Sequence, residues 1–200
     1  MHLNFKHARI NNKKQEKGLS LIESAMVLAL AATVTAGVMF YYQSAADSNK
    51  TQSAISEVMS ATSAINGLYI GRSDYTGLKE AVLVNSSAIP DNYKDQQNNK
   101  IRNPFGGNLS VAPKGNNGSG FGYHITLDNL PKSACVSLAT LNLGTSAAGY
   151  GVNITDPTAT TTFGNAATSG NAKNSAISPS EATDSCNNNN NSNKVTYFMK

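Results

Sequence analysis

Residues 19–42 read LSLIESAMVLALAATVTAGVMFYY, and this stretch, which directly follows Gly18, decides the fold. It is 24 residues long, and Glu23 is its one charged residue. At about 1.5 Å per residue, a helix of this length spans a hydrocarbon layer of about 30 Å. An ionised carboxylate inside such a segment costs several kcal/mol, so it is expected to be functional and to have a partner. Glu23 is therefore the first candidate functional residue.

Positive charge gathers ahead of this stretch. Residues 1–18 contain five lysines and arginines against one glutamate, a net charge of +4, and the whole chain of 200 residues also carries +4. The remainder is neutral and lacks the clustered Lys and Arg on which nucleic-acid binding depends. Basic residues before a first apolar segment hold that end in the cytoplasm, so the C-terminal part is expected on the outer side of the membrane.

The segment differs from an ordinary secretory signal. Its apolar run is longer, it contains an acid, and its basic region has 18 residues. A cut after Gly18 would remove the basic leader and keep the apolar helix. On these residues alone, a simple membrane anchor or a conventional signal cut near residues 31–36 stays open as an alternative.

Gly18, Glu23 and the apolar helix together resemble the type IV prepilins. In that family a prepilin peptidase that faces the cytoplasm removes a leader ending in glycine, and glutamate is the fifth residue of the mature chain. With Leu19 as the first mature residue, Glu23 is the fifth. The resemblance implies cleavage between Gly18 and Leu19 and assembly into a filament. It leaves open whether Leu19 is N-methylated.

The chemistry of Glu23 is consistent with assembly. Cleavage would free an α-amine on Leu19 that can be cationic at neutral pH. The amine of a neighbouring subunit, one step along a filament, would neutralise Glu23, whereas a wrong stagger would leave both charges in an apolar bundle. The alternative is that Glu23 pairs with the amine of its own helix, four residues earlier.

The helical period continues beyond Tyr42, where polar residues appear. One apolar face recurs at three- and four-residue spacing, at Ile55, Val58, Met59, Thr62, Ile65, Leu68 and Tyr69. Residues 19–70 are therefore predicted to form one helix, roughly 75 Å long. Its apolar half, residues 19–42, is expected to protrude as transmembrane segment and filament core, and its second half to pack on a globular head, residues 71–200.

The head has the pattern of an α+β domain. Residues 71–108 are rich in turn formers and are expected to be a long surface connection. Residues 109–111, 121–127 and 195–199 are short β-prone runs that predict an antiparallel sheet. Pro131 and Gly144 favour a helix from Pro131 to about Leu143.

The chain has two cysteines, Cys135 and Cys186, both in the part predicted to be translocated. Because an oxidising exterior favours pairing, we expect one disulfide, with two buried free thiols as the alternative. The bridge would bound a lobe, residues 135–186. Residues 145–194 are mostly Ser, Thr, Asn, Ala and Gly, which cannot form a core alone. They are expected to face outward, either setting bundling and cell recognition or being inert.

Two head segments point to one branch of the family. RNPFGG at 102–107 and LDNLPKSAC at 127–135 look like segments of type IVb pilins, in which a cysteine on a short helix pairs with one near the C-terminus. The leader length and a first mature residue other than phenylalanine also fit this branch. The similarity extends to the major subunits of the thin pili of conjugative plasmids and related enterobacterial type IVb pili.

No catalytic, metal-binding or cofactor motif is present. The sequence lacks CxxC, HExxH, GxSxG and a phosphate-binding glycine loop. Only His124 lies outside the leader among the histidines, and it is predicted to be a structural residue on a strand. We therefore expect neither an enzyme nor a cofactor.

The resemblance implies a type IVb pilin: an inner-membrane precursor with a cytoplasmic N-terminus and a periplasmic head, and later an extracellular homopolymer. Its implied partners are prepilin peptidase, an inner-membrane assembly platform with its ATPase, an outer-membrane secretin, a minor tip pilin, and a recipient or host cell surface. Adhesion, aggregation and conjugative mating are all compatible roles. The alternatives are a pseudopilin of a type II-like secretion system, a minor pilin, and an anchored binding protein that forms no polymer.

Overall fold

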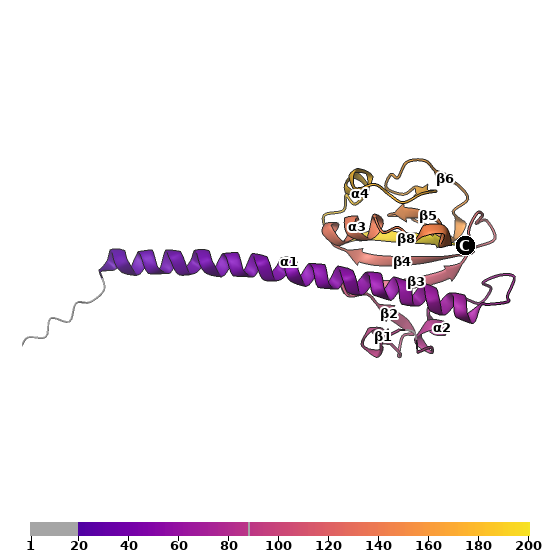
Figure 1. The fold of residues 1–200 in the computed structure, drawn as a ribbon, viewed down its shortest axis with the longest axis horizontal. Coiled ribbons are helices and arrows are strands. Elements are labelled where there is room, and N and C mark those ends of the chain that lie inside the picture. The colour runs from indigo at the N-terminus through magenta and orange to yellow at the C-terminus, as the bar shows by residue number, and fades with distance from the viewer. Residues whose placement is uncertain (1–19, 88) are drawn as a thin grey trace, which may run out of the picture. The chain divides into compact units, whose positions relative to one another are not determined.

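The computed structural model describes residues 20–87 and 89–200 of the chain. It divides into two compact units, an N-terminal unit up to Ser44 and a head unit, Ala45–Lys200. Helix α1, Leu21–Leu68, contributes to both units and agrees closely with the helix predicted for 19–70 (Figure 1). Leu19 and the leader before it lie outside the described residues.

The N-terminal unit consists of the first part of α1. This part is rich in Ala, Leu, Met and Val and has no proline, so its composition favours an uninterrupted helix. Its backbone begins with Ser24 N–H donating to the Ser20 carbonyl at 2.9 Å. The helix thus starts directly after the predicted cleavage point.

The head unit is built on one eight-stranded sheet, in the order β1-β2-β3-β4-β8-β5-β7-β6. Figure 1 shows β3, β4, β8 and β5 side by side. Neighbours pair antiparallel except β6 and β7, which are parallel. The strands are β1 Lys94–Asp95, β2 Lys100–Arg102, β3 Asn108–Pro113, β4 Tyr123–Leu130, β5 Ala147–Val152, β6 Phe163–Gly164, β7 Ala172–Lys173 and β8 Asn193–Met199.

One face of the sheet carries the main core. Alternation along β4 turns Tyr123, Ile125 and Leu127 to this face, where they are fully buried. The same core holds Val58 and Ile65 of α1. Helix α3, Lys132–Ala139, and helix α4, Pro179–Ser185, also contribute to it, through Cys135, Leu138, Ala182 and others. The second half of α1 therefore packs on the head as predicted, but its buried face differs from the predicted one. Met59 and Leu68, which were predicted on that face, are 59% and 50% exposed, and Ala54 and Ala61 are buried instead.

The opposite face holds a smaller cluster. Phe121, Phe163 and Phe198 meet edge to face, with ring centroids 5.0–6.2 Å apart. The Phe163 ring lies so close to Gly149 of β5 that a Cβ there would collide with it. Glycine in this strand therefore permits the aromatic packing.

Three segments differ from the sequence prediction. Residues 71–108 are not merely a connection, because they contain helix α2, Glu80–Val84, the 3-10 helix η1, Asp91–Tyr93, and strands β1 and β2. Helix α3 ends at Ala139 rather than near Leu143. The backbone N–H of Leu143 instead donates to the Tyr150 hydroxyl at 2.9 Å, beyond the end of the helix.

The largest difference is in the polar segment 145–194. It supplies β5, which pairs with β8 near the middle of the sheet and buries Tyr150 and Val152. It also contains the 3-10 helices η2, Gly144–Ser146, which begins one residue earlier, and η3, Pro157–Ala159. The composition led to an underestimate of the strand content of this segment, because Ala and Gly have low strand propensity, which pairing with neighbouring strands can override.

Candidate assembly site

The large apolar side chains of the N-terminal unit are exposed. Twelve of them are 60–87% accessible: Leu21, Ile22, Met26, Val27, Leu28, Leu30, Val34, Val38, Met39, Phe40, Tyr41 and Tyr42. By length and composition α1 could cross a membrane. A helix that is apolar on every side is stable only when lipid or other protein surrounds it. This stretch is therefore a candidate surface for membrane insertion and for assembly.

Glu23 lies in the first turn of this helix. Its Oε2 accepts a hydrogen bond from the backbone N–H of Ser20 at 2.9 Å, so the carboxylate caps the start of its own helix. The positive end of the helix dipole also favours an acid at this position. A free subunit can thus hold Glu23 without a partner from another chain. Gly18 and Leu19, the predicted cleavage residues, lie outside the described part of the chain.

Cys135 and Cys186 form a disulfide, as expected, with Cα atoms 5.9 Å apart and a sequence separation of 51 residues. Both cysteines are fully buried. The bridge joins α3 to the residue that follows α4. It closes the loop that contains β5, β6 and β7, so it bounds a part of the sheet as well as surface loops.

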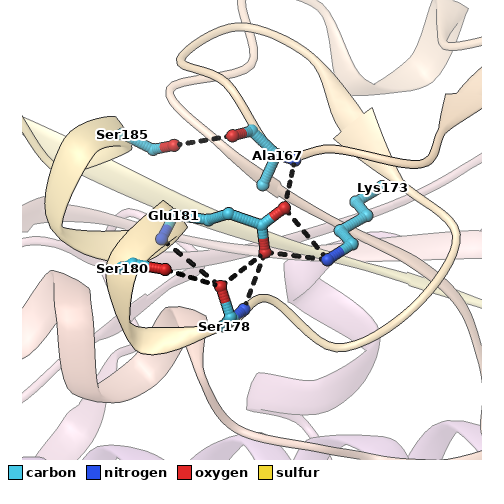
Figure 2. A network of polar contacts seen from close by, with 6 residues as sticks. All are labelled: Ala167, Lys173, Ser178, Ser180, Glu181 and Ser185. Atoms are coloured by element: carbon cyan, nitrogen blue, oxygen red, sulfur yellow. Dashed lines mark hydrogen bonds and ion pairs between the residues drawn. The ribbon is translucent and has the colours of Figure 1, made fainter.

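A polar network fixes the outer part of this lobe (Figure 2). Ser178 caps α4, and its hydroxyl and backbone N–H donate to the Glu181 carboxylate at 2.8 and 2.9 Å. Lys173 Nζ lies 2.7 Å from the same carboxylate, and Ala167 N–H donates to it at 3.2 Å. These donors, Lys173 first, lower the pKa of Glu181 to about 2. The network ties α4 to β7 without a large apolar side chain.

The two segments that resemble type IVb pilins lie against each other. Asn103, which is 3% exposed, accepts from Phe105 and Gly107 N–H at 2.9 and 3.2 Å and donates to the Asp128 carbonyl at 2.8 Å. Asp128 Oδ1 in turn accepts from Asn108 N–H at 2.6 Å. The arrangement clamps the β2–β3 turn to the end of β4, which is a structural role.

His124 is buried on β4, 5% exposed, as the prediction of a structural residue required. Its Nδ1 lies 3.3 Å from the Thr126 hydroxyl. Desolvation lowers the pKa of His124 to about 4, partly offset by Asp156. Within residues 20–87 and 89–200, no cluster of three His, Cys, Asp or Glu side chains could hold a metal ion.

Glu57 is a residue that the sequence pattern did not single out. It lies on the half of α1 that packs on the sheet, and it is only 2% exposed. Its neighbours on the buried face are Ala54, Val58 and Ala61, so an acid occurs at the spacing of core positions. No sequence signal pointed to Glu57, because the predicted apolar face ran through Met59 and Leu68, which are 59% and 50% exposed in the structure.

Comparison with known proteins places the chain among pilus subunits. The bundlin family model matches residues 43–200. The major structural subunits of bundle-forming pilus from Escherichia coli O111:H- and from Escherichia coli O127:H6 (strain E2348/69 / EPEC) are each 69% identical over 193 residues, covering 96% of this chain and 99% of the relative.

A solved structure supports the fold. TcpA, a type IV pilin from Vibrio cholerae El Tor biotype, is similar with a TM-score of 0.51 at 15% identity. The similarity covers 76% of this chain and 99% of that one. The long N-terminal helix on an antiparallel sheet is thus shared with a type IV pilin, as the sequence predicted.

Proposed function

The chain belongs to the bundlin family, and from this premise we propose that it is the major structural subunit of a type IVb pilus that forms bundles. Like its relatives, it is a structural pilin and not an enzyme. The observation that carries the proposal is the exposed apolar half of α1 in a chain that matches pilus subunits over nearly its whole length. Such a helix is stable in a bilayer or in a bundle of its own copies.

The precursor is processed after Gly18. Removal of the basic leader by prepilin peptidase leaves Leu19 as the new N-terminus and keeps the apolar helix. The order of residues supports this step, because the lysines and arginines of 1–18 all precede the glycine and Glu23 follows it by five positions. The subunit then waits in the inner membrane with its head in the periplasm.

Glu23 sets the register of the filament. In a free subunit it accepts from the Ser20 N–H. In the polymer the Leu19 amine of a neighbouring subunit neutralises it. A stagger that leaves the two charges apart in an apolar bundle is disfavoured by several kcal/mol. The ion pair therefore selects one axial step.

Assembly uses the machinery that type IVb pili share. A platform and an ATPase of the inner membrane extract the subunit, a secretin passes the filament through the outer membrane, and a minor pilin occupies the tip. The exposed filament then binds cells or other filaments. Adhesion and aggregation follow from this arrangement. The name of the two relatives, major structural subunit of bundle-forming pilus, is consistent with it.

One experiment tests processing and polymerisation together. Filaments sheared from cells are examined by electron microscopy, and the subunit by intact mass and N-terminal sequencing. We expect long filaments whose subunit begins at Leu19, contains one disulfide and reveals any N-methylation. A subunit that retains residues 1–18, or material found only as monomers, would contradict the proposal. Short periplasmic rods without extracellular filaments would instead identify a pseudopilin.

A role in conjugative mating is the narrower alternative. It rests on the resemblance of the head segments to thin pili of conjugative plasmids. Transfer frequency of a test plasmid, compared between cells with and without this subunit, decides it. Unchanged transfer with lost cell aggregation would restrict the role to adhesion.

A further inference from the structure

Glu57 lines a small pocket on the surface of the head unit. The pocket has a volume of about 160 Å³ and is lined by Ser53, Ser56, Glu57, Ser60, Pro90 and Tyr93. Glu57 is 2% exposed, and among the described residues neither carboxylate oxygen has a hydrogen-bond partner. A buried carboxylate left without partners is rare in folded proteins and indicates a missing ligand.

Among the described residues of the head unit, no charged group neutralises this acid. The facing segment carries Asp91 and Lys94, which are paired with each other at 2.8 Å. Tyr93 contributes an uncharged side chain, and on α1 Asp47 and Lys50 lie about two or more turns away. Glu57 lies beyond the membrane-length stretch 19–42, and burial raises its pKa to about 8. At neutral pH the free subunit therefore holds Glu57 mostly protonated.

The chemistry of the pocket favours a primary ammonium as ligand. An ionised carboxylate attracts cations and repels anions, and three serines from α1 supply hydroxyl acceptors. A lysine ammonium has three donors and no acceptor, on a narrow stem. The pocket volume of about 160 Å³ is several times the roughly 30 Å³ share of one water molecule. It has room for the ammonium and the methylenes next to it.

A second copy of the chain is the partner that fits. The pocket lies on α1, the same helix whose apolar half needs cover from other copies in a filament. Several exposed lysines of the head unit, including Lys50, Lys79 and Lys132, form no ion pair with any residue in 20–87 or 89–200. A pilus contains many copies of the head, so every subunit has neighbours that carry these lysines.

We propose that in the assembled filament the Glu57 pocket receives a lysine ammonium from a second copy of this chain. The inference rests on the proposed function and adds an intersubunit contact in the head. Glu57 loses its proton when the ammonium enters, so the free subunit carries no buried charge and the filament carries a matched pair. Removing one partner of a buried ion pair is strongly destabilising, because it leaves the other charge buried and uncompensated.

Carbon-13 NMR of glutamate-labelled protein at pH 7 tests the ionisation state directly. The chain has five glutamates, so Glu57→Gln assigns the Glu57 carboxyl by difference in the full-length, detergent-solubilised subunit. We expect one protonated glutamate in that subunit and none in sheared wild-type filaments. A protonated glutamate that persists in filaments would overturn the proposal. So would ionisation of Glu57 in the free subunit on addition of sodium chloride alone.

Cross-linking identifies the donor. A carbodiimide joins a carboxylate to an ammonium in contact with it, so filaments should give covalent dimers whose linked peptide contains Glu57 and one lysine. Glu57→Gln should remove these dimers and lower filament yield severalfold, whereas Asp184→Asn, which removes an exposed acid of α4, should do neither. Dimers linked only through other acids, with normal yield from Glu57→Gln, would reject the contact.

The two levels of inference fail in different ways. If wild-type cells release no filaments, the proposed function itself is wrong. If filaments form and begin at Leu19 while Glu57 stays protonated, only the head contact is wrong.

Discussion

Glu23 and Glu57 both lie on α1, and their carboxylates differ in exposure and in hydrogen bonding. Glu23 is exposed in the described structure and caps the helix start through Ser20. Glu57 is enclosed and has no hydrogen-bond partner among the described residues. Glu23 could be singled out from the sequence because it is the one charge in an apolar run. The burial of Glu57 could not be predicted, because only the packed head reveals that its side of α1 is covered.

Replacing Glu23 tests the register argument at the scale of one side chain. Glu23→Val should give a cleaved, membrane-inserted subunit with at least tenfold fewer sheared filaments, because no charge remains to pair with the Leu19 amine. Asp47→Asn, an exposed acid on the same helix, is the matched control and should assemble normally. Normal filament yield from Glu23→Val, counted by electron microscopy, would refute the pairing.

His124 should make the stability of the head depend on pH. The folded-state pKa is about 4, below the ordinary value of 6.5, so the unfolded chain binds more protons between these values. The free energy of unfolding should therefore fall as pH drops from 6.5 to 4, by roughly 3 kcal/mol from this residue. His124→Gln should remove that part of the slope.

Thermal melts of the full chain in detergent, from pH 4 to 7, measure the His124 effect. Glu57 titrates in an overlapping range with the opposite sign, because its pKa is raised. Glu57 contributes equally to the wild type and to His124→Gln. The difference between the two proteins in how stability changes with pH therefore isolates the effect of His124. Parallel slopes would show that His124 is not buried in its neutral form.

At the scale of elements, those marked by local periodicity were predictable from the sequence, and those that depend on pairing with distant strands were not. The helix α1 and the strands β3, β4 and β8 follow from three- and four-residue spacing or from alternation of β-branched and aromatic residues. Strand β5 reads AAGYGV, with small residues that carry little strand signal. It becomes a strand because β8 pairs along it and the Phe163 ring packs over Gly149.

The disulfide is the element-scale feature with the largest predicted effect. Replacing both Cys135 and Cys186 by serine opens a loop of 51 residues. The chain-entropy relation gives a loss of about 4 kcal/mol. The variant should melt at a clearly lower temperature, and a reducing agent should lower the wild-type melting temperature but leave that of the variant unchanged. Equal melting temperatures in the two proteins would contradict a stabilising bridge.

For the whole molecule, the sequence predicted an α+β pilin with a cationic leader and a neutral remainder. Residues 19–200 have no net charge, since the leader accounts for the +4 of the chain. A surface without net charge does not repel its copies, which favours lateral association of filaments. The contacts that hold neighbouring filaments were beyond prediction because they depend on surfaces of several chains.

Bundling should respond to charge on the run of five asparagines at residues 187–191. Asn189 and Asn190 are exposed, so changing both to Asp adds two negative charges per subunit without disturbing the core. We expect filaments of normal number but thinner bundles in low salt, with recovery in about 1 M salt, where the screening length is about 3 Å. The uncharged polar control is Asn189→Gln with Asn190→Gln. Bundles of unchanged width in low salt would exclude this surface from lateral contacts.

Strand β8, residues 193–199, lies between β4 and β5 although it comes after both in the chain. On the export route proposed above, β4 and β5 would reach the periplasm with their inner edges unpaired, and each edge can template pairing with a foreign strand. The head cannot close until β8 has also been translocated. Secretion of this subunit should therefore depend on chaperones that shield open strand edges until the last of the sheet arrives.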